Sequence, residues 1–161
     1  MDISELLQLG ARIGDRLVER GETVAVAEGS CGGLISTALL ARPGASAYFR
    51  GGSIIYTQHA TRGFLSGEIE TPPGLRGASE PFVRYLSESV ARRLGATWGI
   101  GEGGATGPSG NPYGDPAGHV WVGIWGPSTV TRHHLTGDDD RSRNMVAFAT
   151  VALETFADAL A

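Results

Sequence analysis

The sequence has no lysine, one cysteine, no long apolar run and no cluster of basic residues. All 13 of its Lys and Arg residues are arginines, so a mechanism that needs a lysine base, Schiff base or phosphate clamp cannot operate on this chain alone. The single cysteine, Cys31, excludes an internal disulfide and fits a reducing compartment. The net charge of −4 argues against nucleic acid as a partner, because phosphate binding needs clustered cations.

No stretch of the chain approaches the roughly 20 apolar residues of a membrane-spanning helix. Residues 1–5 lack the charged and apolar regions of a signal peptide. We therefore expect a cytoplasmic protein without a membrane partner. The chain does have 161 residues with 41% hydrophobic composition, which is enough for one globular domain over residues 1–161 with a core of its own.

The regular elements alternate between strand and helix early in the chain and end with a hairpin and a helix. The expected helices cover residues 2–20, 34–40, 79–94 and 138–160, and the expected strands cover 23–27, 53–56, 96–100, 119–125 and 129–135. Asp2 followed by Glu5 indicates a capping box, and Ser79 is a favourable N-cap. Residues 99–118 are rich in glycine and proline and are expected to form a loop. This order predicts an α/β layered fold with a mixed sheet.

The turn between the first strand and the second helix is the first candidate for chemistry. Glycine-rich turns at helix starts expose backbone N–H groups, so residues 28–33 could bind a phosphate or a carboxylate. A tight structural turn is the alternative. Cys31 lies in the same turn, where a thiol with a depressed pKa could act as a nucleophile. Because no histidine is near it in sequence, a small packing residue is the favoured interpretation of Cys31.

Two further segments are candidates for a site. Ser46 follows a Pro-Gly turn and would need an adjacent base to become a nucleophile, with His59 and Glu28 as the only local bases. The glycine-rich segment 101–110 follows a strand, where open α/β sheets bind ligands, and its glycines permit close backbone approach. A mobile lid or a hairpin is the alternative for this segment.

Seven segments occur in the order and spacing of the motifs of one family. They are Ala27–Gly33 for A-E-S-C-T-G-G, Pro43–Phe49 for P-G-S-S-A-Y-F, Gly51–Gln58 for G-G-x-x-x-Y-S-N, 78–80 for V-S-E, 104–108 for G-I-A-G-P, 116–121 for P-V-G-T-V-Y and 137–143 for G-D-R-x-x-x-R. In these motifs the chain resembles the CinA C-terminal-domain family, which includes stand-alone nicotinamide mononucleotide deamidases. The resemblance covers nearly the whole chain.

This resemblance implies a three-layer α/β/α sandwich that hydrolyses the nicotinamide carboxamide to a carboxylate and releases ammonia, without a metal or cofactor. It also implies a serine–lysine pair as the catalytic groups. The family lysine falls at Thr61, and the serine of A-E-S falls at Gly29. The positions carried over as catalytic candidates are Ser30, Cys31, Ser46 and Thr61. Those carried over as ligand-binding are Glu28, Gly32, Gly33, Tyr56, Thr57, Gly104, Thr106, Gly107 and Arg143.

Two functions fit these substitutions. The first is an amidohydrolase with a rewired site, in which Ser30 or Cys31 replaces the lost serine and His59 replaces the lysine as base. The second is a catalytically inactive paralogue that binds a pyridine-nucleotide-like small molecule or a protein partner. Homo-oligomers are common for such domains. If the fold matches the family, Thr61 and Ser46 face the same pocket.

Overall fold

The computed structural model describes all 161 residues and contains one five-stranded sheet in the order β2-β1-β3-β4-β5. The strands are β1 (Val24–Glu28), β2 (Phe49–Ile54), β3 (Trp98–Ala105), β4 (His119–Trp125) and β5 (Val130–Leu135). β1 runs parallel to both β2 and β3, whereas β3, β4 and β5 form an antiparallel meander. The expected mixed sheet is therefore confirmed.

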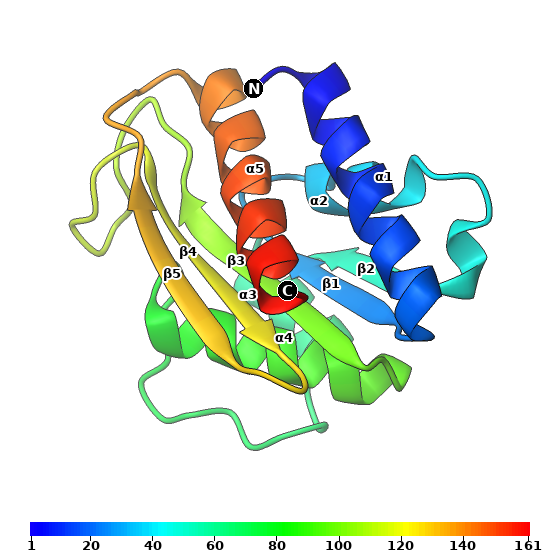
Figure 1. Ribbon diagram of the computed structural model, residues 1–161. Coiled ribbons are helices and arrows are strands. Elements are labelled where there is room, and N and C mark those ends of the chain that lie inside the picture. The colour runs from blue at the N-terminus through cyan, green and yellow to red at the C-terminus, as the bar shows by residue number, and fades with distance from the viewer.

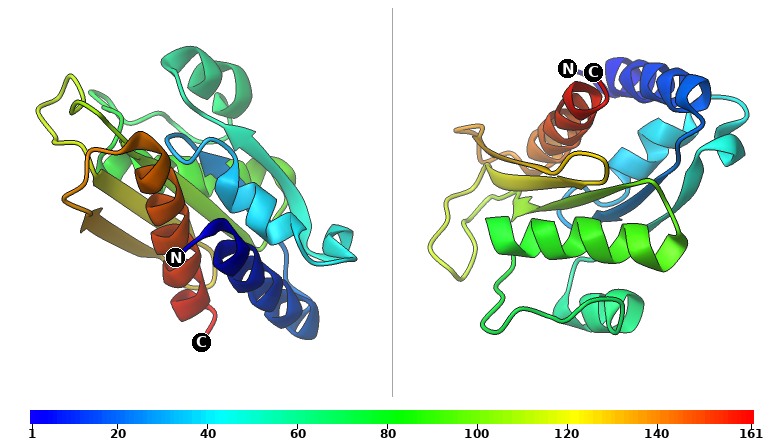
Figure 2. Two further views of the ribbon diagram at one scale, coloured as in Figure 1. Left: turned by 90° about the horizontal axis from the view of Figure 1, so that it is seen from above. Right: turned by 60° about the horizontal axis from the view of Figure 1, so that its bottom comes forward.

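Helices cover both faces of this sheet (Figures 1 and 2). The helices α1 (Ile3–Arg20), α2 (Leu34–Leu40) and α5 (Arg141–Ala159) lie on one face. The other face is covered by α4 (Glu80–Leu94), against which α3 (Gln58–Leu65) packs from outside. A short 3-10 turn, η1 (Ala45–Ala47), precedes β2. The three-layer α/β/α sandwich is confirmed.

The ends of the long helices follow from local sequence. Asp2 and Glu5 form the predicted capping box of α1, and Gly21 ends that helix with a left-handed φ of 63°. The hydroxyl of Ser79 accepts from the N–H of Phe82 and so caps α4. No helix combines the length and the apolar character needed to cross a bilayer.

The central strand is longer than the sequence indicated. Residues 101–105 were expected to be part of a loop but belong to β3, and the connection to β4 begins at Thr106. The glycines of β3 are needed because α4 lies directly against the strand. A Cβ atom at Gly99 would come within 1.9 Å of the Ser87 carbonyl oxygen, and one at Gly101 within 2.4 Å of the Val83 carbonyl oxygen.

The edge strand β2 also differs from its expected range of 53–56. It begins at Phe49 and ends at Ile54, so Tyr56 and Thr57 follow the strand rather than belong to it. The Thr57 hydroxyl accepts from the N–H of Ala60 and caps α3. The carboxyl end of β2 is thereby connected directly to a helix that stands beside the sheet.

Candidate functional site

A cavity of about 390 Å³ opens at the carboxyl ends of the three parallel strands, between the sheet and helices α3 and α4. Its walls carry polar and aromatic side chains. The main polar ones are Ser30, Thr57, Gln58, Thr61, Arg62 and Asn111, and the aromatic ones are Tyr56, Phe82, Tyr85 and Tyr113. The connections after β1 and after β2 cross opposite faces of the sheet, and open α/β sheets bind ligands at such points (Figure 2).

The turn that follows β1 is held from inside by the carboxylate of Glu28. Glu28 is fully buried and accepts from the N–H groups of Gly33 (3.1 Å), Ile35 (3.0 Å) and Ser36 (2.9 Å). The Ser36 hydroxyl donates to the same carboxylate at 2.7 Å. The positive end of α2 is therefore neutralised by a group of the protein itself.

This arrangement favours the alternative of a tight structural turn at residues 28–33. Of the N–H groups in this segment, that of Gly33 donates to Glu28, those of Gly29 and Cys31 donate to Glu102, and that of Gly32 donates to the Gly29 carbonyl oxygen. None of Glu28, Gly32 and Gly33 lines the cavity. No local sequence signal indicates that a buried carboxylate fills the place of a ligand, because the same glycine-rich turn can bind either one.

A second buried carboxylate, Glu102 of β3, lies on the other side of the turn. Its Oε2 atom accepts from the N–H groups of Gly29 (2.9 Å) and Cys31 (3.0 Å), and its Oε1 atom accepts from the Ser30 hydroxyl. Burial raises the pKa of Glu102, the hydrogen bonds from Ser30 and Cys31 oppose that rise, and the charge of Glu28 adds to it. Ser30 itself lines the cavity.

Glu102 was not among the residues expected to form the site. The sequence does contain one signal for it, because a single carboxylate within an apolar and glycine-rich strand has to be buried with partners. The signal is visible only if residues 101–105 are assigned to the strand, whereas their glycine content indicates a loop.

Cys31 and His59 do not have the surroundings that catalysis would require of them. Cys31 is fully buried, and burial and then the charges of Glu102 and Glu28 raise the pKa of its thiol well above the ordinary value. Its side chain belongs to the hydrophobic core, as the packing interpretation expected. His59 is exposed on α3 and does not line the cavity. The alternative of a reactive Cys31 thiol with a depressed pKa is therefore wrong.

Thr61 occupies the place that was expected of it. It lies in α3, one turn after Thr57, and its hydroxyl donates to the Thr57 carbonyl oxygen at 3.3 Å. Thr61, Thr57 and Tyr56 all line the cavity together with Ser30. The Tyr56 hydroxyl also accepts from the guanidinium of Arg141 at 3.0 Å, which ties this wall to the start of α5.

Ser46 lies away from this cavity. It is an exposed residue of η1, before β2, whereas Thr61 follows the opposite end of that strand. The six residues of β2 span roughly 20 Å, so the two side chains cannot face one pocket. The expectation that Ser46 and Thr61 share a pocket is wrong, because β2 begins four residues earlier than the sequence indicated.

Of the remaining residues that were expected to bind a ligand, one lines the cavity and three do not. Gly104 lines the cavity, together with Gly103. Thr106 and Gly107 do not; their carbonyl oxygens accept from Asn144 (2.9 Å) and Arg141 (3.0 Å), which fix the start of α5. Arg143 does not reach the cavity either.

Two carboxylates hold Arg143 at the surface. Its guanidinium bonds to Asp138 at 2.7 Å and lies 3.4 Å from Asp140. The pKa of Asp138 is strongly lowered, chiefly by its hydrogen bonds from Arg143. Arg143 therefore fixes the turn before α5.

Comparison with known proteins assigns nearly the whole chain to one family. Residues 6–160 match the family model described as the CinA C-terminal domain. A CinA-like protein of Desulfosudis oleivorans is 39% identical over 150 residues, which cover 92% of this chain and 36% of that protein. A CinA-like protein of Anaeromyxobacter dehalogenans is 39% identical over 141 residues, 86% of this chain and 34% of that protein. The chain spans about a third of the length of these curated relatives.

Solved structures share the fold over nearly the whole chain. The competence damage-inducible protein A of Klebsiella pneumoniae has a TM-score of 0.86 at 27% identity, covering 95% of each chain. The competence/damage inducible protein CihA of Agrobacterium tumefaciens has a TM-score of 0.84 at 29% identity, covering 96% of this chain and 94% of that one.

Proposed function

The chain belongs to the family of CinA C-terminal domains, and we propose that it is an amidohydrolase that acts on a pyridine-nucleotide amide such as nicotinamide mononucleotide. The observation that carries this proposal is the hydrogen bond from the Ser30 hydroxyl, in the cavity wall, to the buried carboxylate of Glu102. A serine becomes a nucleophile when an adjacent base takes its proton. In this proposal Ser30 is the nucleophile and Glu102 is the base.

Glu102 replaces the absent lysine from a different element. The base comes from β3, whereas the family lysine would stand at Thr61 on α3. The raised pKa of Glu102 suits this role, because a carboxylate with a higher pKa is the stronger proton acceptor near neutral pH. The two N–H groups that bind Oε2 fix the carboxylate, and Oε1 remains directed at Ser30.

The reaction proceeds in two halves. The Ser30 oxygen attacks the carboxamide carbon while its proton passes to Glu102. Glu102 then returns this proton to the amide nitrogen, which leaves as ammonia, and Ser30 is acylated. Water hydrolyses the ester with Glu102 again accepting and returning the proton, which regenerates the Ser30 hydroxyl and releases the carboxylic acid product.

One backbone donor is available for the developing oxyanion. Among the N–H groups of residues 29–33, only that of Ser30 has no acceptor in the protein. An N–H group next to the attacking oxygen stabilises the negative charge of a tetrahedral intermediate. We assign that role to the Ser30 N–H.

The cavity suits a small aromatic ligand with an anionic group. Its volume of about 390 Å³ falls in the usual range for small-molecule sites. Phe82 and Tyr113 offer rings for stacking. Arg62 is the one charged side chain in the lining and is the expected partner of a ligand phosphate.

A second function, ligand binding without turnover, is favoured by one specific observation. The position that carries the family lysine is Thr61, which faces the cavity with a short and neutral side chain. Without a cation there, the site has one base fewer than the resemblance implies. In this alternative Glu102 only stabilises the turn.

Measurement of both binding and turnover separates the two functions. The purified chain is incubated with nicotinamide mononucleotide, and ammonia and nicotinic acid mononucleotide are quantified alongside the ligand-induced shift in melting temperature. We expect turnover above a buffer blank, and Glu102→Gln should lower the rate roughly 10²- to 10⁴-fold while keeping the shift. The control Glu88→Gln, which removes a surface carboxylate paired with Arg92 on α4, should change neither quantity.

Each outcome has a definite meaning. A thermal shift without turnover would support ligand binding alone. Turnover that survives in Glu102→Gln would exclude Glu102 as the base. If the chain shows neither a thermal shift nor turnover, nicotinamide mononucleotide is not its ligand.

A further inference from the structure

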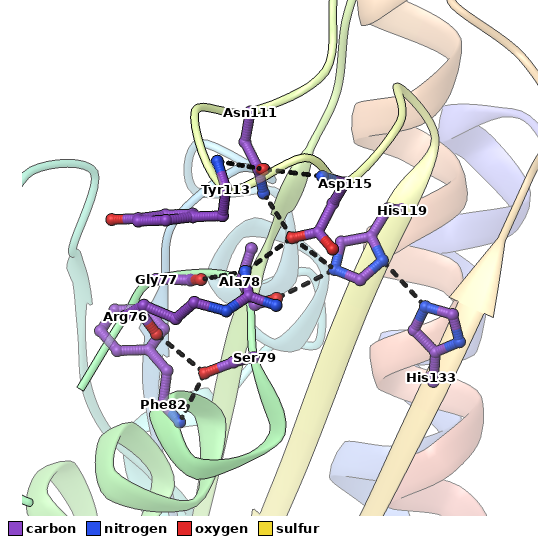
Figure 3. A network of polar contacts seen from close by, with 10 residues as sticks. All are labelled: Arg76, Gly77, Ala78, Ser79, Phe82, Asn111, Tyr113, Asp115, His119 and His133. Carbon is purple, nitrogen blue, oxygen red and sulfur yellow. Dashed lines mark hydrogen bonds and ion pairs between the residues drawn. The ribbon is translucent and has the colours of Figure 1, made fainter. Parts of the chain in front are cut away.

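The cavity is covered by two loops that a polar network joins (Figure 3). Arg76, in the loop before α4, donates to the Asp115 carboxylate at 2.7 Å, in the loop before β4. The Asn111 side-chain amide donates to the same Asp115 oxygen at 2.8 Å. The hydrogen bond from Arg76 is the main reason why the pKa of Asp115 is lowered. The ion pair between Arg76 and Asp115 therefore joins the two loops directly.

A pair of histidines fixes the base of this network. The imidazole of His119, which is buried, lies with Nε2 at 2.9 Å from the Ala78 carbonyl oxygen and 3.6 Å from Asp115. Because a carbonyl only accepts, Nε2 carries the hydrogen, and Nδ1 accepts from Nε2 of His133 at 2.9 Å. Residue 78 is thus bonded to β4, and β4 to β5, as Figure 3 shows.

The ion pair itself lies outside the cavity, but its immediate neighbours line it. Gly77 and Tyr113 are lining residues, whereas Arg76 and Asp115 are not. The guanidinium carbon of Arg76 lies 5.1 Å from the centre of the Tyr113 ring. A Cβ atom at Gly77 would be 3.8 Å from that ring, so the ring rests against the backbone of the other loop. Asn111, which bonds to the same carboxylate, also lines the cavity, but Tyr113 is the lining residue whose ring faces the guanidinium, so an effect of Arg76 on the stacking of a ligand passes through Tyr113.

The ring of Tyr113 needs these contacts with Arg76 and Gly77 to stay fixed in the cavity lining. Its side chain is 48% exposed, and apart from these contacts the N–H of Tyr113 donates to the Asn111 side chain at 3.0 Å. Figure 3 shows the rings of Tyr113 and Phe82 on the same side of the network. An exposed ring that is held in place loses less conformational freedom when a ligand stacks on it.

We propose that Arg76 is a positioning residue for the ligand of this cavity, because its ion pair with Asp115 and its stacking on Tyr113 hold that ring as an aromatic wall for a flat ligand ring. This inference rests on the proposed function for the identity of the ligand. The polar bonds of Arg76 act between protein groups, and Tyr113 makes the contact with the ligand.

A double-mutant cycle tests this indirect role. The dissociation constant of nicotinamide mononucleotide is measured by calorimetry for the wild type, Arg76→Ala, Tyr113→Ala and the double variant. Each single variant should weaken binding roughly three- to tenfold, the size of one aromatic stacking contact. The double variant should bind no more weakly than Tyr113→Ala. Asp115→Asn removes the ion pair from its other side and should reproduce the effect of Arg76→Ala.

The control is Arg84→Ala, which breaks an exposed ion pair with Glu80 on α4 and should leave the affinity unchanged. Additive effects of Arg76→Ala and Tyr113→Ala would overturn the proposal, since Arg76 would then act without Tyr113. Equal affinity for the wild type and Arg76→Ala would overturn it as well.

A ligand-free measurement separates this inference from the proposed function. The four tyrosines are labelled as 3-fluorotyrosine, and the Tyr113 fluorine resonance is assigned with Tyr113→Phe. In Arg76→Ala this resonance should move towards the position of free fluorotyrosine, and in Arg84→Ala it should stay where it is. If the wild type fails to bind nicotinamide mononucleotide, the proposed ligand is wrong, and an unmoved resonance would independently refute the role of Arg76.

Discussion

Glu28 and Glu102 are both fully buried, and the two carboxylates accept four and three hydrogen bonds respectively. A buried carboxylate without such partners would be destabilised by several kcal/mol. The turn after β1 supplies most of these donors, so its shape and the two carboxylates depend on each other. Ser30 is the residue of the cavity lining whose side chain donates to Glu102, so the same hydrogen bond stabilises the turn and places a hydroxyl in the cavity wall.

The ionisation of Glu102 should be visible in the pH dependence of stability. Its pKa in the folded protein is raised above the ordinary value of 4.5, so the folded state binds this proton more tightly than the unfolded state does. The free energy of unfolding of the wild type, relative to Glu102→Gln, should therefore be highest below 4.5 and fall as the pH rises through the folded pKa. Urea denaturation at a series of pH values measures this difference. A difference that grows with pH would show a lowered pKa instead.

Cys31 should be chemically inert in the folded protein. Its thiol is buried, and its raised pKa keeps it protonated at neutral pH, whereas the reactive species is the thiolate. A thiol-specific reagent at pH 7.5 should label the native chain far more slowly than the same chain in denaturant. Rapid labelling of the native chain, quantified by mass spectrometry, would contradict the burial of this side chain.

At the scale of elements, backbone contacts through glycine decide how the helices pack. Gly10 of α1 meets α2 so closely that a Cβ atom there would lie 2.2 Å from the Ala38 carbonyl oxygen. Gly99 and Gly101 allow the same closeness between β3 and α4. These contacts bring the helices near enough to the sheet for one cavity to be lined by β3, α3 and α4 together.

Two alanine substitutions at helical glycines should have opposite effects on stability. Gly10→Ala should lower the free energy of unfolding by about 1–3 kcal/mol, because α1 and α2 have to move apart. Gly63→Ala in α3 meets no atom within 4 Å and should raise it by about 0.5–1 kcal/mol through helix propensity. Urea denaturation of both variants provides the check, and equal effects would contradict the close packing of α1 on α2.

The family lysine can be restored at position 61 of α3 to raise the rate of deamidation. Thr61→Lys should place an ammonium group in the cavity and raise the rate of deamidation, measured as ammonia release from nicotinamide mononucleotide. Adding Gly29→Ser should raise it further, although the new Cβ atom would lie 3.2 Å from the Ile55 carbonyl oxygen, so a small shift is needed. A rate below that of the wild type in both variants would mean that the cavity no longer accepts the family arrangement.

The elements that local sequence signals define were predicted well. The capping box of Asp2 and Glu5 and the N-cap Ser79 fix the starts of α1 and α4 by contacts between near neighbours in the chain. Gly101 was wrongly predicted to lie in a loop. It is a strand residue whose lack of a side chain allows α4 to lie close to β3, and no local pattern reveals that contact. The prediction that Ser46 faces the cavity was wrong for a related reason. The start of β2 is set by its pairing with β1, which is also not a local signal.

At the scale of the whole molecule, the cavity lies where the topology of an open α/β sheet places ligand sites. The order of the motifs was sufficient to predict the family and the layered fold. The identity of the base could not be predicted in this way. Glu102 reaches Ser30 only because β1 and β3 are adjacent and in register at Glu28 and Glu102.

In the proposed reaction the attacking serine is Ser30 and not Ser46. The most direct test compares kcat/KM for nicotinamide mononucleotide in the wild type, Ser30→Ala and Ser46→Ala, measured as ammonia release. Ser30→Ala should lose at least about 10²-fold, because it removes the nucleophile, and Ser46→Ala should stay within about twofold of the wild type. A large loss in Ser46→Ala with little change in Ser30→Ala would contradict the account.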